Sequence, residues 1–202
     1  MNEERPVKAV PQKCRGHIPV AIWETPQWRL VRHALANDHV IVSFDAEWEY
    51  QPPNRVTELG VAIFRGGAIK VHNLRVRGRA RPINGLTTRY LAEDAAKSWL
   101  QATLRSADLL VGHALQNDRR KMKQWGCPLP SMQTMPTVDT GAWSRVTNQV
   151  NGNPRRLAHL ADQYGINRRG MHVAGKDALV TLQVALAMAA TEPEGPSIAP
   201  PY

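Results

Sequence analysis

The chain has 202 residues, and its 26 lysines and arginines against 17 aspartates and glutamates give a formal net charge of +9. This length suits one domain with a full hydrophobic core. The charge favours polyanionic partners, nucleic acid first, although a generally basic surface is the plain alternative. Two cysteines without a CxxC spacing argue against a disulfide scaffold and a cysteine-based zinc site.

No apolar run reaches the length of a membrane span, and the N-terminal residues lack the apolar core of a secretory signal. Together with the low cysteine use, this predicts a cytoplasmic protein with no membrane partner. We expect a flexible basic arm over residues 1–22, a single domain over residues 23–190, and a proline-rich, disordered tail over residues 191–202.

The first half of the chain predicts one helix and three strands. Thr25-Pro26 can cap and begin a helix that ends near residues 37–38. Arg65-Gly66-Gly67 has the composition of a hairpin turn. The apolar pattern around it predicts strands over residues 39–44, 56–64 and 68–76.

In the second half, helices alternate with short strands. Apolar spacing and helix stop signals predict helices over residues 91–107, 116–125, 153–165 and 175–190. Short buried strands are predicted over residues 109–111 and 137–139. The expected fold is α/β, with one mixed five-stranded sheet flanked by helices, in which three antiparallel strands precede two short parallel strands.

Four carboxylates and one histidine form the candidate site. Asp45 and Glu47 follow the apolar run of the first strand, and strand alternation points both to one side. Asp118 lies in the helix after the strand over residues 109–111, and Asp177 lies in the first turn of the last helix, with His172 just before it. Four converging acids would raise one another's pKa values, a conflict that two divalent cations would remove. All-oxygen ligands suit Mg²⁺ or Mn²⁺, and such a pair can activate water and stabilise the leaving oxygen of a phosphodiester.

Each of these signals is weak by itself. A D-x-E triplet arises by chance in about half of chains of this size. Asp118 alone would more often be a surface helix residue, and His172 alone a loop histidine. Asp139 could serve as a reserve ligand, but a turn or capping role is favoured for it.

Taken together, three segments resemble the DEDDh-type 3′→5′ exonucleases of the ribonuclease T/oligoribonuclease superfamily, which have the ribonuclease H-like fold. The segments are Val42-Ser43-Phe44-Asp45-Ala46-Glu47, residues 110–118, and His172 through Asp177. The last reads His-Val-Ala-Gly-Lys-Asp-Ala and is closest in wording to a fungal branch with His-Asn-Ala-Gly-Asn-Asp-Ala. The other branch of the family has a tyrosine four positions before the last aspartate. Here Val173 occupies that position and His172 stands five before, which favours the h-type.

The resemblance implies roles for these residues. Asp45, Glu47 and Asp177 would hold the metal that activates water, Asp45 and Asp118 would hold a second, and His172 would be the general base. It also implies two Mg²⁺ or Mn²⁺ ions, single-stranded RNA or DNA with a free 3′ end as substrate, and nucleoside monophosphates as products. The oligomeric state is left open, with a homodimer as one option.

Four further residues are candidates for substrate contact: Trp48, His113, Arg168 and Arg169. Trp48 could stack on a terminal base or simply pack over the sheet end, and packing is slightly favoured. The two arginines precede His172, at the expected mouth of the site, which favours a phosphate role. The alternating Arg75, Arg77, Arg79 and Arg81 either track phosphates or form a charged sheet edge, with equal weight.

Three positions depart from the pattern of the resembled family. Many relatives have threonine where this chain has Trp48, asparagine where it has Ala114, and an aromatic residue where it has Asn117. None of these removes an expected ligand, so the departures bear on substrate choice. Two other functions stay open, namely a catalytically idle nucleic-acid-binding or adaptor module on the same fold, and a structure-directed endonuclease on fold analogy alone.

Overall fold

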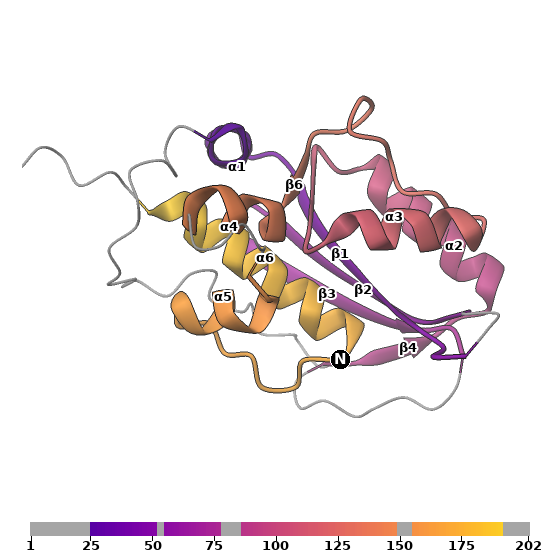
Figure 1. Cartoon of the computed structure of the whole chain (residues 1–202). Coiled ribbons are helices and arrows are strands. Elements are labelled where there is room, and N and C mark those ends of the chain that lie inside the picture. Colours follow the sequence, from indigo (N-terminus) through magenta and orange to yellow (C-terminus); the bar gives the residue numbers. More distant parts are fainter. Residues whose placement is uncertain (1–24, 52–54, 78–85, 149–154, 192–202) are drawn as a thin grey trace, which may run out of the picture.

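The structure, a computed structural model, describes residues 25–51, 55–77, 86–148 and 155–191. These residues form six helices and six strands (Figure 1). In chain order the elements are α1 (Pro26–Ala36), β1 (Ile41–Trp48), β2 (Val56–Arg65), β3 (Ala68–Arg75), β4 (Thr88–Tyr90), α2 (Glu93–Arg105), β5 (Leu109–Gly112), α3 (Leu115–Gln124), β6 (Thr137–Asp139), α4 (Thr140–Asn148), α5 (Leu157–Gln163) and α6 (Ala174–Ala190).

All six strands belong to one mixed sheet, with the order β4-β3-β2-β1-β5-β6. β1, β2 and β3 are antiparallel neighbours, and β5 runs parallel to both β1 and β6. The predicted mixed sheet is therefore confirmed in its topology, but the prediction has five strands and the structure has six. The missed strand, β4, has three residues and pairs in parallel with the edge of β3, and such a short segment carries no readable periodicity.

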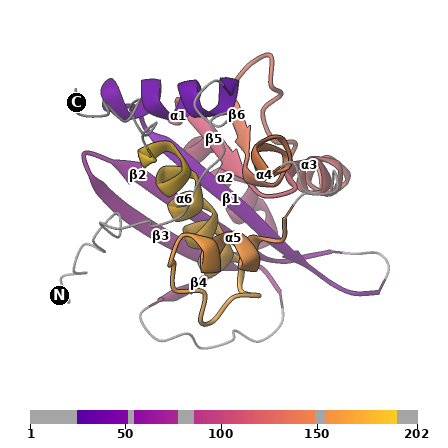
Figure 2. The ribbon, with the colours of Figure 1, turned by 60° about the vertical axis from the view of Figure 1, so that its left-hand side comes forward.

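Helices cover both faces of the sheet (Figures 1 and 2). Buried side chains of α1, α4, α5 and α6 form one core on one face, and those of α2 and α3 form a second core on the other. α6 crosses its face centrally and contacts β1, β2 and β3, while α1 and α5 pack against it. Because neighbours surround it, α6 is apolar on nearly every side.

β1 extends beyond its predicted end at residue 44, since its ladder with β2 continues to Trp48. Ile41 contributes to the core under α6, whereas Phe44 contributes to the core on the opposite face. By alternation Asp45 and Glu47 lie on the α6 face. A register shift separates Glu47 from Trp48, so the two acids occupy the last regular positions of the strand.

The helix start at Thr25-Pro26 is confirmed, because the Thr25 side chain accepts a hydrogen bond from the Trp28 N–H at 3.3 Å and Pro26 begins α1. α4 was not predicted. Its sequence, TGAWSRVTN, combines glycine, threonine and serine, which have low helix propensity, and its first turn is capped by Asp139.

The alternating arginines do not form an open comb where the structure describes them. Arg75 is 13% exposed and pairs with Glu58 at 3.0 Å, and Arg77 pairs with Glu93 at 2.8 Å. Both guanidinium groups therefore contact carboxylates within the protein. Arg79 and Arg81 lie outside the described residues, as do the predicted arm over residues 1–22 and nearly all of the predicted tail.

Over the described ranges, no helix has both the length and the apolar character needed to cross a bilayer. The domain boundaries near residues 22 and 190 stay predictions.

Candidate active site

The structure brings three of the four predicted acids together. Carboxylate oxygens of Asp45, Glu47 and Asp177 all lie within 4.8 Å of one another. β1 contributes the first two from adjacent positions on one face, and α6 contributes Asp177 from its first turn. The cluster thus joins residues more than half the chain apart, through the packing of α6 on the sheet.

Asp118, on α3, lies outside this group of three, but it acts on the group electrostatically. Burial is the first cause that raises the pKa of Asp118, to about 7, and the charge of Glu47 adds to it. In turn, the charge of Asp118 helps to raise the pKa of Asp45. Asp118 therefore interacts electrostatically with acids of the cluster.

Two carboxyl groups of the cluster have raised pKa values, so they ionise less readily than ordinary aspartates. Burial, followed by the charges of Asp118, Asp177 and Glu47, raises the pKa of Asp45 well above its usual value. Burial also raises the pKa of Asp177 to about 6, although a backbone hydrogen bond from His172 opposes this. Partly buried carboxylates that repel one another form an oxygen donor set that suits a hard divalent cation.

His172 is tied to the cluster by its backbone. Its N–H lies 3.1 Å from Oδ2 and 3.3 Å from Oδ1 of Asp177. The residue has a φ of 68°, in the left-handed region, and its side chain is exposed. The imidazole is therefore accessible to solvent beside the carboxylates and does not belong to the group of three acids.

Trp48 is the last residue of β1, and His113 directly follows β5, the parallel neighbour of β1. The Trp48 ring is half-buried, packs against the core beneath α2 and α3, and has the Lys121 ammonium 5.1 Å from its centroid. His113 Nδ1 lies 2.9 Å from Thr140 Oγ1, and that hydroxyl donates to the Gly112 carbonyl. The hydroxyl must therefore accept from Nδ1–H, which leaves Nε2 as the acceptor of a neutral ring. Burial lowers the pKa of His113, which also favours the neutral form.

The two arginines before His172 are exposed. Arg168 forms an ion pair with Asp162 at 2.6 Å, in which both side chains are about half exposed, while Arg169 donates its backbone N–H to the Asn167 side chain. An exposed pair of this kind is weak, so the Arg168 guanidinium can exchange its partner.

Asp139 caps two helices at once, which confirms its predicted capping role. Its carboxylate accepts from the N–H groups of Ala114 and Leu115 at 3.1 and 2.8 Å, at the start of α3. It also accepts from Gly141 and Ala142 at 2.9 and 3.1 Å, at the start of α4. Asp139 thereby anchors α3, the helix that carries Asp118.

Sequence reasoning assigned no role to Glu58 and Asn73, which are buried on the α6 face of β2 and β3. The sequence did show a charged residue and an amide within two apolar strands. Because buried polar groups need hydrogen-bond partners, this pattern could have indicated a role for them. Their partners lie on other elements, and the sequence pattern did not place them.

The sequence profile of the family described as "DNA polymerase III subunit epsilon-like, C-terminal domain" (DEDDh_C) matches residues 76–188, more than half of the chain. The chain belongs to this DEDDh family. The resemblance to DEDDh-type exonucleases is thereby confirmed, while the closeness to a fungal branch stays a prediction. A search of curated proteins found no match.

Solved structures show the same fold. Escherichia coli exonuclease I in complex with a dT13 oligonucleotide aligns with a TM-score of 0.52 and 15% identity, over 74% of this chain and 40% of that chain. The complex of the same enzyme with dA16 aligns with a TM-score of 0.50 and 14% identity, over 75% and 40%. The Neurospora crassa Pan2 catalytic unit aligns with a TM-score of 0.50 and 14% identity, over 93% and 30%.

These matches confirm the expected ribonuclease H-like α/β fold of the DEDDh chain. The chain spans less than half the length of each of these proteins. At such identities the likeness concerns the fold alone.

Proposed function

We propose that this DEDDh chain is a metal-dependent 3′→5′ exonuclease that acts on single-stranded RNA or DNA. The observation that carries the proposal is the meeting of Asp45, Glu47 and Asp177 within 4.8 Å, in a chain of a DEDDh family. Family membership supports nuclease activity, and the net charge of +9 suits a polyanionic substrate.

The donor set fits divalent ions. Every group in it is a carboxylate, which suits Mg²⁺ or Mn²⁺ better than zinc. Burial, with repulsion from neighbouring acids as a smaller cause, already raises the pKa values of Asp45 and Asp118. Asp45, Glu47 and Asp177 would hold one ion, and Asp45 with Asp118 would hold the second. When bound, such a pair lowers the pKa of water and neutralises charge that develops on the leaving oxygen.

His172 would take the proton from the attacking water, because a neutral imidazole has one ring nitrogen that accepts a proton. The water oxygen forms a bond to the phosphorus of the terminal phosphodiester, and the bond from that phosphorus to the 3′ oxygen of the preceding nucleotide breaks. The released 3′ oxygen gains a proton. The products are a nucleoside 5′-monophosphate and a chain shortened by one nucleotide.

Substrate contacts would come from Trp48, His113, Arg168 and Arg169. Trp48 follows Glu47 in the chain and has the Lys121 ammonium over its ring, and the charge of Lys121 also acts on Asp118. That combination suits the base and phosphate of a terminal nucleotide. The weak Arg168–Asp162 pair leaves a guanidinium available to phosphate. Exonuclease I, which shares the fold, was solved with dA16 and dT13 oligonucleotides, and this supports a nucleic-acid substrate here.

The test uses 5′-labelled single-stranded RNA and DNA, incubated with Mn²⁺, Mg²⁺ or EDTA. We expect a metal-dependent ladder of single-nucleotide steps, release of monophosphates, and loss of both in Asp45→Ala. The matched control is Asp94→Ala, which removes an exposed acid of α2. Binding without cleavage under every metal condition would overturn the proposal in favour of an idle binding module. Cleavage of a circular substrate would instead indicate an endonuclease.

A further inference from the structure

Two rows of facing residues cross the sheet under the first turn of α6. In each row the residues are register partners on neighbouring strands, so they share one face, and for both rows that is the face covered by α6. The first row is Asp45, Gly60, Asn73 and Thr88, and the second is Glu47, Glu58, Arg75 and Tyr90. The candidate metal ligands Asp45 and Glu47 therefore share these rows with residues that are not candidate ligands.

Gly60 lets α6 rest directly on β2. A Cβ at this position would lie 1.9 Å from the carbonyl carbon and oxygen of Ala174, which leaves no room for any side chain. Gly175 is similarly close to the sheet, since a Cβ there would lie 2.8 Å from the Asn73 Cβ. The start of α6 is thus seated over Gly60, with Asp45 on one neighbouring strand and Asn73 on the other.

Asn73 caps α6 from the sheet. The Gly175 N–H donates to Asn73 Oδ1 at 2.8 Å, whereas the N-cap residue Val173 offers no side-chain cap. The Asn73 amide nitrogen donates to Thr88 Oγ1 at 2.9 Å and to a carboxylate oxygen of Glu58. This pattern fixes the amide orientation, because a flipped amide would face an N–H with its own N–H and a carboxylate with its own carbonyl.

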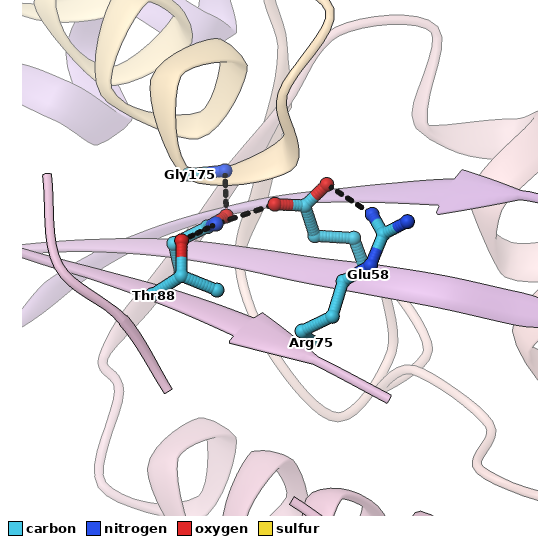
Figure 3. A network of polar contacts seen from close by, with 5 residues as sticks. Glu58, Arg75, Thr88 and Gly175 are labelled. Atoms are coloured by element: carbon cyan, nitrogen blue, oxygen red, sulfur yellow. Dashed lines mark hydrogen bonds and ion pairs between the residues drawn. The ribbon is translucent and has the colours of Figure 1, made fainter. Parts of the chain in front are cut away.

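Glu58 completes the arrangement (Figure 3). Its side chain is 2% exposed, and its second oxygen accepts from Arg75 at 3.0 Å. Glu58 lies opposite Glu47 in the sheet, yet it does not belong to the group of acids that could hold a metal. Its oxygens are committed to Asn73 and Arg75.

We propose that Asn73, oriented by Glu58, is a positioning residue that places Asp177 in the candidate metal site. Asn73 binds the N–H of Gly175, two residues before Asp177 in the same first turn, and so holds the end of α6 that carries the ligand. The proposal rests on the metal-binding function proposed for Asp177. It assigns a functional role to two buried residues that would touch neither metal nor substrate.

The test measures Mn²⁺ binding to the full chain by electron paramagnetic resonance. Asn73→Ala leaves the Gly175 N–H without its partner, and Asn73→Asp keeps an acceptor there but sets a carboxylate against Glu58. We expect both to weaken Mn²⁺ binding by about 10- to 100-fold, the range found for groups that orient metal ligands. Adding Glu58→Gln to Asn73→Asp restores a donor between the two side chains and should recover most of the affinity.

Asp108→Ala is the matched control. Its carboxylate accepts from the Val40 N–H at 2.8 Å, at the opposite end of β1, so the variant loses a hydrogen bond without touching α6. It should bind Mn²⁺ like the wild type. Thermal melts identify which variants are folded. If Asn73→Ala does not fold, the positioning role is tested by comparing Asn73→Asp with and without Glu58→Gln. Folded Asn73 variants with wild-type affinity, or no rescue by Glu58→Gln, overturn the positioning role alone. A wild-type chain that binds no Mn²⁺ overturns the proposed function as well.

Discussion

The backbone N–H of His172 donates to the carboxylate of Asp177, with N–O distances of 3.1 and 3.3 Å. The left-handed backbone at His172, with φ at 68°, turns the chain so that this N–H faces the first turn of α6. The link therefore does not involve the imidazole. Removing the ring leaves the hydrogen bond to Asp177 in place.

His172→Ala should consequently separate catalysis from metal binding. Loss of a general base lowers kcat by about 100-fold or more, whereas Mn²⁺ affinity should stay at the wild-type value. Single-turnover cleavage of a labelled oligonucleotide and Mn²⁺ titration measure the two quantities. A parallel loss of metal affinity would show that the ring itself supports the ion.

His172→Gly is the matched variant for the backbone. A non-glycine residue in the left-handed region costs about 1–2 kcal/mol. Both variants lack the imidazole, so both should be inactive, but the glycine variant should unfold at higher urea concentration than the alanine variant. Equal midpoints would contradict a strained backbone at this position.

The stability of the metal-free protein should fall as pH rises from about 5 to 8. Burial raises the pKa of Asp118 to about 7 and that of Asp177 to about 6, above the value of about 3.9 for an unfolded aspartate. Carboxyl groups with raised pKa values bind protons more tightly when folded, so they favour the folded state at low pH and lose that advantage as they ionise. Glu93, whose pKa is lowered to about 2 by Lys97 and then Arg77, remains ionised throughout this window. Burial lowers the pKa of His113, so this residue acts in the opposite direction, but the raised pKa values of Asp45, Asp118 and Asp177 outnumber it.

Urea denaturation in EDTA at several pH values measures this trend. Adding Mg²⁺ or Mn²⁺ at pH 8 should restore stability, because a bound cation favours the ionised carboxylates. Sodium chloride at equal ionic strength controls for screening and should not restore it. Stability that is flat in EDTA, or that rises with pH, would refute the electrostatic conflict within the cluster.

Asp118→Asn should make the metal-free protein more stable and abolish cleavage. The side chain has the same size but no charge, so at pH 8 it removes the burial of a charge and the smaller repulsion with Asp45 and Glu47. The loss of attraction to Lys121 opposes this, and the net gain is on the order of 1 kcal/mol. Asp94→Asn, an exposed change in the first turn of α2, serves as the control. It should leave activity unaltered and lower stability slightly, because a carboxylate is favourable at a helix N-terminus. A destabilised Asp118→Asn would indicate that this carboxylate has a structural partner.

Local patterns were sufficient to predict the parts of the site that depend on one element. The apolar run before Asp45 marked β1, and the two-residue period placed Asp45 and Glu47 on one face. The position of Asp177 in the first turn of α6 followed from the apolar helix pattern. These features require no knowledge of which strands are neighbours.

The rest depends on register between distant segments. Asn73 acquires its role only because β3 pairs with β2 so that it faces Gly60, and because α6 then docks over that glycine. Likewise, α4 has a weak helical sequence and starts at a cap supplied by Asp139. Neither pairing register nor docking is encoded in a short window, because a one-residue slip would give an equally plausible local pattern.

The backbone also explains one departure from the family pattern. Ala114 has φ 55° and ψ 37°, in the left-handed region, at the start of α3. Asparagine and glycine tolerate this conformation far better than alanine does. The asparagine of many relatives therefore suits the backbone found here, and Ala114 occupies its place at a cost in stability.

Ala114→Gly should accordingly stabilise the chain by about 1 kcal/mol, which corresponds to a rise in Tm of about 2–4 °C for a protein of this size. Ala102→Gly is the control, since this exposed alanine lies inside α2, where glycine costs about 0.5–1 kcal/mol. The same chemical change should thus have opposite signs at the two positions in thermal melts. If both variants lose stability, the left-handed conformation of Ala114 does not carry the expected strain.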